Sequence, residues 1–196
     1  MRALVTGGAK RLGREISVYL ANRGYDVAVH YNSSENEALD VAKEINSQGR
    51  LSECLKCDLL IEDQVKALVP LASEALGGPI SMLVNNASIF EHDSFDDATR
   101  ASWDRHMESN LRAPFVLTQA FSKQSPSPIL DKKNEPISQG LVLNMIDQRV
   151  KKLTPDFASY TIAKMGLWAM TQTAARALAP NIRVNAIGPG PTLIGA

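Results

Sequence analysis

The sequence has few cysteines, no long apolar run and no net charge. Only two cysteines occur in 196 residues, and acidic and basic residues balance at 21 each. A membrane-spanning helix needs roughly 20 consecutive apolar residues, and no run approaches that length. Zero net charge gives no attraction for nucleic acid or for an acidic membrane surface. We therefore expect neither a nucleic-acid partner nor a membrane association.

The two cysteines have the C-x-x-C spacing of redox-active and zinc-binding pairs. Cys54 and Cys57 fall within residues 51–57, which read as a strand, where positions three apart face opposite sides of the sheet. No second pair and no histidine cluster in the sequence completes a zinc site. We therefore predict two free thiols and no metal ion. The N-terminus carries no signal-peptide pattern, so a cytoplasmic location is expected.

Strand-like and helix-like segments alternate along the chain. β-branched and apolar runs predict strands at residues 3–5, 26–31, 51–57, 80–85, 140–146 and 182–187. Helical periodicity predicts helices at residues 13–22, 34–48, 61–76, 100–122 and 158–178. This alternation predicts one α/β domain over residues 1–196, a doubly wound parallel sheet flanked by helices. The polar, proline-containing residues 125–139 are expected to form a surface loop.

A glycine-rich turn joins the first strand to the first helix. It reads Thr6-Gly7-Gly8-Ala9-Lys10-Arg11-Leu12-Gly13. Glycines let the backbone turn tightly and approach a pyrophosphate at the N-terminus of the helix. The turn therefore predicts a dinucleotide site formed by Thr6, Gly7, Lys10, Arg11, Leu12 and Gly13.

The end of the second strand predicts which dinucleotide is bound. NAD-binding folds usually place an acidic residue there to hold the ribose 2′-hydroxyl. The four residues at this point carry no acid: His30, Tyr31, Asn32 and Ser33. With Lys10 and Arg11 nearby, they suit a 2′-phosphate, so the sequence predicts NADP(H). After the third strand, Asp58 and Leu59 are expected to contact the cofactor, Asp58 at the adenine, although Asp58 suits a helix cap equally well.

Tyr160 and Lys164 are four residues apart and would share one face of the predicted helix 158–178. A nearby ammonium favours the phenolate, so Lys164 is expected to lower the pKa of Tyr160 from about 10. Such a phenol suits proton transfer to a carbonyl, an alcohol or an imine. The spacing alone is common, and other motifs are needed to give it meaning.

Five motifs in this order resemble the short-chain dehydrogenase/reductase family. They are the loop at residues 6–13, Asn85-Asn86-Ala87, Ser109-Asn110-Leu111, Tyr160-x-x-x-Lys164 and Pro189-Gly190-x-Thr192. The resemblance covers the whole chain. It implies a Rossmann fold with strand order 3-2-1-4-5-6-7 and a nicotinamide cofactor.

The resemblance also implies roles for the motif residues. Tyr160 would donate a proton, Lys164 would hold the nicotinamide ribose, and Asn110 would hold a water in a proton relay. Further cofactor contacts would come from Asn86, Ala87, Ser88, Pro189, Gly190 and Thr192. Family members often form homotetramers through two long helices, here residues 100–122 and 158–178. They usually continue through a substrate-covering loop, a helix and a seventh strand, so part of the substrate site is expected to lie outside this sequence.

Two departures from the usual family pattern narrow the resemblance. Arg11 stands where the loop usually has glycine, and Asp147 stands where a serine usually precedes the tyrosine by 13 positions. Both are similar to the pteridine reductase branch, which includes bacterial dihydromonapterin reductases. That branch implies that Phe90 stacks on a pterin ring and Ser88 binds cofactor phosphate or substrate. Arg11 would approach the pyrophosphate and the substrate.

The chemistry of these residues agrees with that reading. Reduction of a ring C=N bond needs hydride on carbon and a proton on nitrogen, and a carboxyl group beside Tyr160 can supply that proton. Phe90 offers a π surface to a flat heterocycle, although it equally suits ordinary core packing. Asp147 equally suits a solvated position at a strand end. The sequence therefore predicts reduction of a pteridine- or folate-type substrate, with the proton supplied by Tyr160 and Asp147.

Two other functions remain open. A 3-oxoacyl-[acyl-carrier-protein] reductase or other carbonyl reductase shares most motifs, but that enzyme is expected to have serine at position 147 and glycine at position 11. A catalytically silent NADP-sensing protein would keep the fold without chemistry. The presence of Asn110, Tyr160 and Lys164 together argues against the silent protein.

Overall fold

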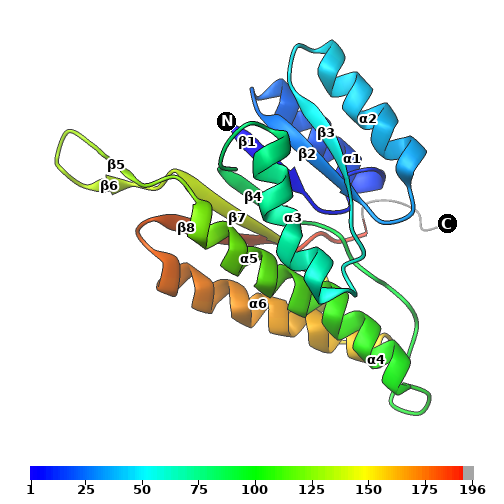
Figure 1. Cartoon of the computed structure of the whole chain (residues 1–196). Coiled ribbons are helices and arrows are strands. Elements are labelled where there is room, and N and C mark those ends of the chain that lie inside the picture. Colours follow the sequence, from blue (N-terminus) through cyan, green and yellow to red (C-terminus); the bar gives the residue numbers. More distant parts are fainter. Residues whose placement is uncertain (192–196) are drawn as a thin grey trace.

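A computed structural model describes residues 1–191 of the chain (Figure 1). Its centre is a sheet of six parallel strands in the order β3-β2-β1-β4-β7-β8. The strands are β1 (Arg2–Val5), β2 (Asp26–Tyr31), β3 (Ser52–Lys56), β4 (Met82–Asn85), β7 (Gly140–Met145) and β8 (Ile182–Ile187). The order confirms the predicted Rossmann arrangement for these six strands.

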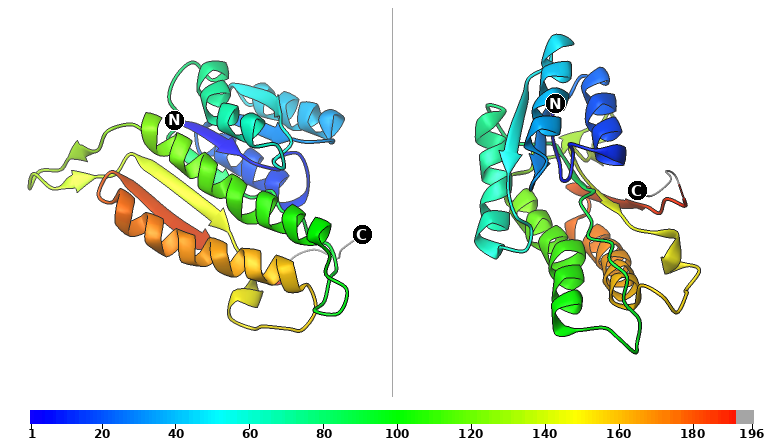
Figure 2. Two further views of the ribbon diagram at one scale, coloured as in Figure 1. Left: turned by 60° about the horizontal axis from the view of Figure 1, so that its bottom comes forward. Right: turned by 90° about the vertical axis from the view of Figure 1, so that its right-hand side faces the viewer.

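Helices cover both faces of the sheet, as Figure 2 shows. On one face, α1 (Arg11–Asn22) and α2 (Glu35–Ser47) pack against an apolar cluster that contains Val5, Val27 and Ile45. On the other face, a second cluster includes Leu4, Leu83 and Phe121, and it is covered by α3 (Glu62–Ala75), α5 (Ala113–Gln124) and α6 (Ala158–Leu178). Within residues 1–191 no helix combines the length and the apolar character needed to cross a membrane.

Two segments differ from the sequence prediction. The single helix expected at residues 100–122 is divided into α4 (Arg100–Met107), a π-helical turn η1 (Glu108–Arg112) and α5. Residues 125–139, expected to be a loop, contain a short antiparallel hairpin of β5 (Ile129–Leu130) and β6 (Pro136–Ile137) that projects from the body of the molecule (Figure 1). A 3₁₀ turn, η2 (Gln148–Val150), follows β7.

The two cysteines are free thiols on opposite sides of the sheet. Cys57 is buried in the cluster under α3, whereas Cys54 packs against the cluster under α2. Burial raises the pKa of Cys57 to about 11, so the thiol stays protonated at neutral pH. The spacing therefore reflects strand geometry rather than redox chemistry.

The sheet order reverses between β1 and β4, and this reversal positions the site. In open α/β sheets, the loops at the carboxyl ends of the strands diverge at such a point and leave a crevice. The loops after β1, β2, β4 and β7 all open at this edge. Most of the predicted motif residues lie on these loops or at the start of α6, while Asp58 and Leu59 follow β3 and Pro189 and Gly190 follow β8.

Candidate active site

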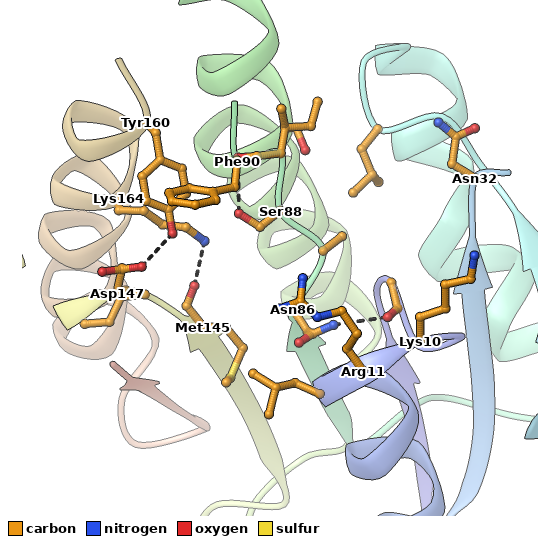
Figure 3. Close-up of a pocket in the computed structure, with 18 of the residues that line it drawn as sticks. Lys10, Arg11, Asn32, Asn86, Ser88, Phe90, Met145, Asp147, Tyr160 and Lys164 are labelled. Atoms are coloured by element: carbon orange, nitrogen blue, oxygen red, sulfur yellow. Dashed lines mark hydrogen bonds between the residues drawn. The ribbon is translucent and has the colours of Figure 1, made fainter. Parts of the chain in front are cut away.

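A cleft of about 580 Å³ lies at the carboxyl edge of the sheet (Figure 3). Most of the predicted site residues line it: Gly7, Lys10, Arg11, Leu12, Gly13, His30, Asn32, Asp58, Leu59, Asn86, Ala87, Ser88, Phe90, Asp147, Tyr160, Lys164, Pro189 and Gly190. The structure thus brings together groups from seven segments: the carboxyl ends of β1, β2, β3, β4, β7 and β8, and the start of α6. Four predicted residues do not line the cleft: Thr6, Tyr31, Ser33 and Asn110. Thr192 lies outside the described residues.

The glycine-rich loop has the tight geometry that the sequence predicts. Gly7 has φ +60°, in the left-handed region that favours glycine. A side chain on Gly13 would overlap the carbonyl oxygen of Gly7, so helix α1 can approach the loop only because position 13 is glycine. The result is a backbone cradle at the N-terminus of α1, the geometry that accepts phosphate groups.

Arg11 occupies a backbone conformation that is unusual for its residue type. Its φ is +50°, a left-handed value that costs a non-glycine residue roughly 1–2 kcal/mol. This is the position where the family loop usually has glycine. The side chain lines the cleft beside Lys10 and Asn86 (Figure 3), so the loop accepts backbone strain and presents a cation to the site.

Thr6 and Asn86 hold the ends of β1 and β4 together. The Thr6 hydroxyl accepts hydrogen bonds from the backbone amides of Asn86 (2.9 Å) and Ala87 (3.0 Å). The Asn86 side-chain amide donates to the carbonyl oxygens of Thr6 (2.9 Å) and Gly7 (3.2 Å). Thr6 therefore shapes the loop from behind, and a direct cofactor contact by this residue stays a prediction.

His30 is buried beneath the phosphate loop. Its Nδ1 accepts the Gly7 amide hydrogen at 2.9 Å, which leaves Nε2 as the protonated nitrogen, and Nε2 lies 3.0 Å from the carbonyl oxygen of Cys57. Burial lowers the pKa of His30 to about 4, so the ring is neutral at physiological pH. His30 thus connects the loops after β1 and β3 at the floor of the cleft.

The cleft end near β2 contains no acidic residue where NAD-binding folds place one. Asn32 lines it, and Lys10 lies across from it on the glycine-rich loop (Figure 3). The Lys10 ammonium pairs with Glu37 of α2 at 2.7 Å, and both side chains are about half exposed. This lysine is therefore close to the ribose end of the cleft, with one carboxylate already bound to it.

Tyr160 and Asp147 form the central contact of the site. The Tyr160 hydroxyl donates to Asp147 Oδ2 at 2.9 Å, which confirms that the 13-residue spacing brings them together (Figure 3). The sequence predicts a lowered pKa for Tyr160, and the structure shows that this is wrong. Burial raises the pKa of Tyr160, and the neighbouring Asp147 carboxylate raises it further, because both disfavour a phenolate.

Lys164 is almost completely buried one turn after Tyr160. Its ammonium donates to the carbonyl oxygen of Met145 at 2.8 Å and lies 5.7 Å from the centre of the Tyr160 ring. Burial lowers the pKa of Lys164 to about 8, and the Asp147 carboxylate opposes that change. The lysine thus faces the cleft from a fixed position, as a ribose-binding role requires.

Asn110 is fully buried in the π-helical turn η1. Its side-chain amide donates to the Ile89 carbonyl oxygen at 2.8 Å, and its carbonyl oxygen accepts from the Ile89 amide at 2.9 Å. Both ends of the side chain are therefore used to hold the segment that carries Ser88 and Phe90. A water-holding role for Asn110 stays a prediction.

Phe90 forms a wall of the cleft together with a residue that the sequence does not indicate. Its ring stacks on Phe157 with centroids 4.2 Å apart and planes 8° apart, and it meets Tyr160 edge-on at 4.8 Å. The Arg149 guanidinium lies 5.3 Å from Phe90 and 4.8 Å from Phe157. Phe90 remains 52% exposed, so it is not part of the hydrophobic core, and a substrate-stacking role stays a prediction.

Six further residues line the cleft that were not predicted to belong to the site: Leu60, Ile89, Arg105, Ser109, Met145 and Ile146. Ser109 lies in the motif Ser109-Asn110-Leu111. Most of the others are ordinary apolar residues, and such residues are not distinguishable from core residues by pattern. The Arg105 guanidinium makes two hydrogen bonds to the Glu91 carboxylate, at 2.7 and 3.1 Å. An arginine and a glutamate 14 positions apart carry no recognisable motif in the sequence.

Comparison with protein families decides the assignment. The model of the short chain dehydrogenase family matches residues 1–195. The chain belongs to this family. The chain is therefore an NAD(P)-dependent oxidoreductase.

Relatives of this chain that match nearly its whole length carry different names. A 3-oxoacyl-[acyl-carrier-protein] reductase, FabG of Staphylococcus epidermidis, is 32% identical over 96% of this chain and 73% of its own. FolM, alternative dihydrofolate reductase 1 of Brucella suis, solved in complex with NADP, is 46% identical over 98% of this chain and 76% of that one, with a TM-score of 0.89. A blue fluorescent protein from a metagenomic library, solved with NADPH, is 32% identical with a TM-score of 0.88, over 97% of this chain and 74% of that one.

Proposed function

We propose that this short-chain dehydrogenase reduces a pteridine- or folate-type substrate with NADPH. The observation that carries the proposal is the 2.9 Å hydrogen bond between Tyr160 and Asp147, directly beside the exposed ring of Phe90. A phenol and a carboxyl group in contact can deliver a proton to a ring nitrogen, and the aromatic wall can hold a flat heterocycle above them. The likeness to FolM supports the same substrate class.

The residues suit NADP(H) as the cofactor. The strained Arg11, the neighbouring Lys10 and the absence of an acid at Asn32 favour a 2′-phosphate over a free ribose hydroxyl. Gly7 and Gly13 leave room for the pyrophosphate at the start of α1. When bound, the reduced nicotinamide supplies the hydride, and two solved relatives hold NADP or NADPH.

The protein's own side chains bind the ribose, orient the substrate and transfer the proton. Lys164 holds the nicotinamide ribose from its buried position, and Phe90 orients the substrate ring. Tyr160 donates its hydroxyl proton to the substrate nitrogen as the neighbouring carbon is reduced. The high pKa of Tyr160 keeps that proton in place until the substrate becomes basic. After that transfer, Asp147, whose side chain is 20% exposed, takes up a proton from water and passes it to Tyr160 Oη across their hydrogen bond.

Reduction of a 3-oxoacyl thioester is the second candidate. It is supported by 32% identity to FabG over nearly the whole chain. A carbonyl substrate needs only one proton donor and an orienting hydroxyl, which Tyr160 and Ser88 can provide. The carboxylate of Asp147 distinguishes the two candidates, because it has no evident use in that reaction.

A substrate panel tests the proposal. NADPH oxidation is followed with dihydrobiopterin, dihydrofolate and an acetoacetyl thioester, one at a time, at equal concentrations. We expect turnover with at least one of the first two and a lower kcat/KM with the thioester. A preference for the thioester would replace the proposed function with the second candidate, and inactivity on all three would favour a silent nucleotide-binding protein.

We also propose that the protein forms a homotetramer through its long helices. An apolar groove runs along α5 and α6 and is lined by Leu111, Phe115, Met170, Ala174 and Leu178 among others. Apolar grooves of this kind on paired helices suit burial against a second copy. Light scattering coupled to size-exclusion chromatography tests the proposal, and a monomeric mass would reject it.

A further inference from the structure

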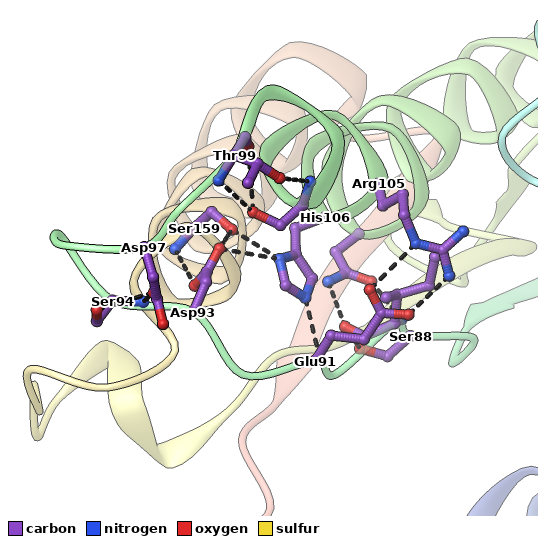
Figure 4. A network of polar contacts seen from close by, with 12 residues as sticks. Ser88, Glu91, Asp93, Ser94, Asp97, Thr99, Arg105, His106 and Ser159 are labelled. Atoms are coloured by element: carbon purple, nitrogen blue, oxygen red, sulfur yellow. Dashed lines mark hydrogen bonds and ion pairs between the residues drawn. The ribbon is translucent and has the colours of Figure 1, made fainter.

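A chain of buried polar side chains lies behind the cleft and takes no part in the chemistry described above (Figure 4). It consists of His106 on α4, Ser159 at the start of α6 and Asp93 in the segment after β4. Their exposed fractions are 0%, 1% and 2%. We call these three residues the His106 relay. Buried polar groups are costly unless they are paired, so a complete network at this place requires an explanation.

The direction of each hydrogen bond in the relay is fixed. The Glu91 backbone amide can only donate, so His106 Nε2 accepts at 3.1 Å and the ring proton is on Nδ1. Nδ1 then donates to the Ser159 hydroxyl at 2.6 Å, and that hydroxyl donates to the Asp93 carboxylate. Ser159 is thus buried with its proton committed to a carboxylate, which excludes it as a nucleophile.

Burial keeps the His106 ring neutral despite the carboxylates around it. Asp93 Oδ2 lies 3.8 Å from Nδ1, while Glu91 and Arg105 form an ion pair with each other on the outer side. The Tyr160 ring approaches edge-on at 6.0 Å. Burial lowers the pKa of His106 against the opposing effect of Asp93 and Glu91, in agreement with an uncharged ring.

The relay joins the two halves of the proposed substrate site. At one end it holds the amide of Glu91, the residue directly after Phe90. At the other end Asp93 accepts from the Ser159 amide at 3.1 Å, and its carbonyl oxygen accepts from the Ala158 amide at 3.1 Å. These amides are at the start of α6, where backbone N–H groups lack partners within the helix. Tyr160 follows immediately.

We propose that the His106 relay is a positioning device that fixes the Phe90 wall relative to Tyr160. His106 does not touch the cleft, and it acts through Glu91 on one side and through Ser159 on the other. The relay holds the rings of Phe90 and Tyr160 in their edge-on contact at 4.8 Å and 72°. The effect of the relay on substrate affinity rests on the proposed function, whereas its hold on the Glu91 backbone amide does not.

Two replacements of His106 separate its two hydrogen bonds. Glutamine places an acceptor near the position of Nε2 and keeps the bond to Glu91, whereas asparagine is too short to reach it. We expect His106→Asn to speed hydrogen–deuterium exchange at the Glu91 amide at least tenfold and His106→Gln to leave it nearly unchanged. The Ile89 amide, held by Asn110, is the internal control and should not change in either variant. An unaltered Glu91 amide in His106→Asn would overturn the proposal without any substrate.

Steady-state kinetics test the consequence for the site. We expect His106→Asn to raise KM for the pteridine about tenfold with kcat within threefold, and His106→Gln to restore KM. In a Phe90→Ala background the same His106→Asn change should alter KM by less than twofold, because the Phe90 ring that the relay would position is already absent. An equal change in both backgrounds would show a general packing effect and overturn the proposal.

A matched control removes a buried hydrogen bond elsewhere on α6. Thr171→Val loses the 2.9 Å contact with Asn144 and lies far from the relay in sequence. It should lower Tm as His106→Asn does while leaving KM unchanged. A parallel rise in KM would mean that loss of stability alone explains the kinetics, and the positioning role would be rejected. If the wild type reduces no pteridine, the proposed function fails. The positioning role of the His106 relay is then tested by hydrogen–deuterium exchange at the Glu91 amide alone.

Discussion

Tyr160 and Asp147 share a hydrogen bond of 2.9 Å, although they come from different elements. Tyr160 is on the first turn of α6, and Asp147 follows β7, where its other oxygen accepts from the Arg149 amide at 2.8 Å. The carboxyl group is therefore held from two sides. Its position beside the buried phenol helps explain why the Tyr160 hydroxyl keeps its proton.

Tyr160→Phe should remove the proton donor without changing the shape of the cleft. We expect kcat to fall by roughly 10²–10⁴-fold, the usual contribution of a positioned general acid. The dissociation constant for NADPH should change little, because Lys164 and the glycine-rich loop are untouched. Single-turnover kinetics and fluorescence titration measure the two quantities. Retention of most of the wild-type kcat would show that another group donates the proton.

Asp147→Ser should separate the two candidate substrates. Serine can orient a carbonyl but cannot resupply a proton, so pteridine turnover should fall on the order of a hundredfold. Turnover of an acetoacetyl thioester should be retained or raised. The measurement is kcat/KM for both substrates in wild type and variant, with the NADPH dissociation constant as control. Equal effects on both substrates would make Asp147 a structural residue.

Glu37→Gln should strengthen NADPH binding. Glu37 pairs with Lys10 at 2.7 Å on the side of the cleft that suits a 2′-phosphate. Release of this exposed ion pair would free the Lys10 ammonium for the phosphate, so the NADPH dissociation constant should fall by roughly two- to fivefold. NADH lacks that phosphate, and its affinity should not change. Calorimetric titration with both nucleotides checks this, and an equal change for the two would show that Lys10 does not reach the phosphate.

His30 should make folding stability depend on pH below neutrality. Its folded pKa is about 4, below the ordinary value near 6.5, so the unfolded chain binds the proton more readily. The stabilisation is therefore complete above about pH 6.5 and is lost as pH falls toward 4. His30→Asn keeps an acceptor for the Gly7 amide but cannot be protonated. Urea unfolding between these pH values should show that the free energy of unfolding falls more steeply for the wild type than for His30→Asn. Parallel plots of that free energy against pH would disprove the assignment to His30.

The sequence predicts the fold and the central pair of the site well. The alternation of strands and helices predicts the parallel sheet, and the family resemblance implies its strand order and the 13-residue spacing that brings Asp147 to Tyr160. Both succeed because they depend on local pattern and on the common edge to which parallel strands deliver their loops. The Lys10 and Arg11 positions follow from the glycine-rich loop in the same way.

The sequence fails where a property depends on burial or on the approach of distant segments. The raised pKa of Tyr160 depends on its burial and on the Asp147 charge, neither of which is visible in the spacing to Lys164. Phe157 stacks on Phe90 from a left-handed position at the start of α6, with φ of 59°. A lone histidine at position 106 likewise gives no sign of its partners, because they lie 15 and 53 positions away in the chain.

The π-helical turn at Glu108–Arg112 joins α4 to α5 and places Asn110 against Ile89 while Phe121 lies in the core. An α-helix rotates about 100° per residue, so one residue added to or lost from the regular turns of α4 or α5 would rotate everything beyond it by about that angle. Either Phe121 would leave the core or Asn110 would turn away from Ile89. Among natural relatives, insertions and deletions should therefore be absent from α4 and α5 and should gather instead in the projecting hairpin at residues 129–137.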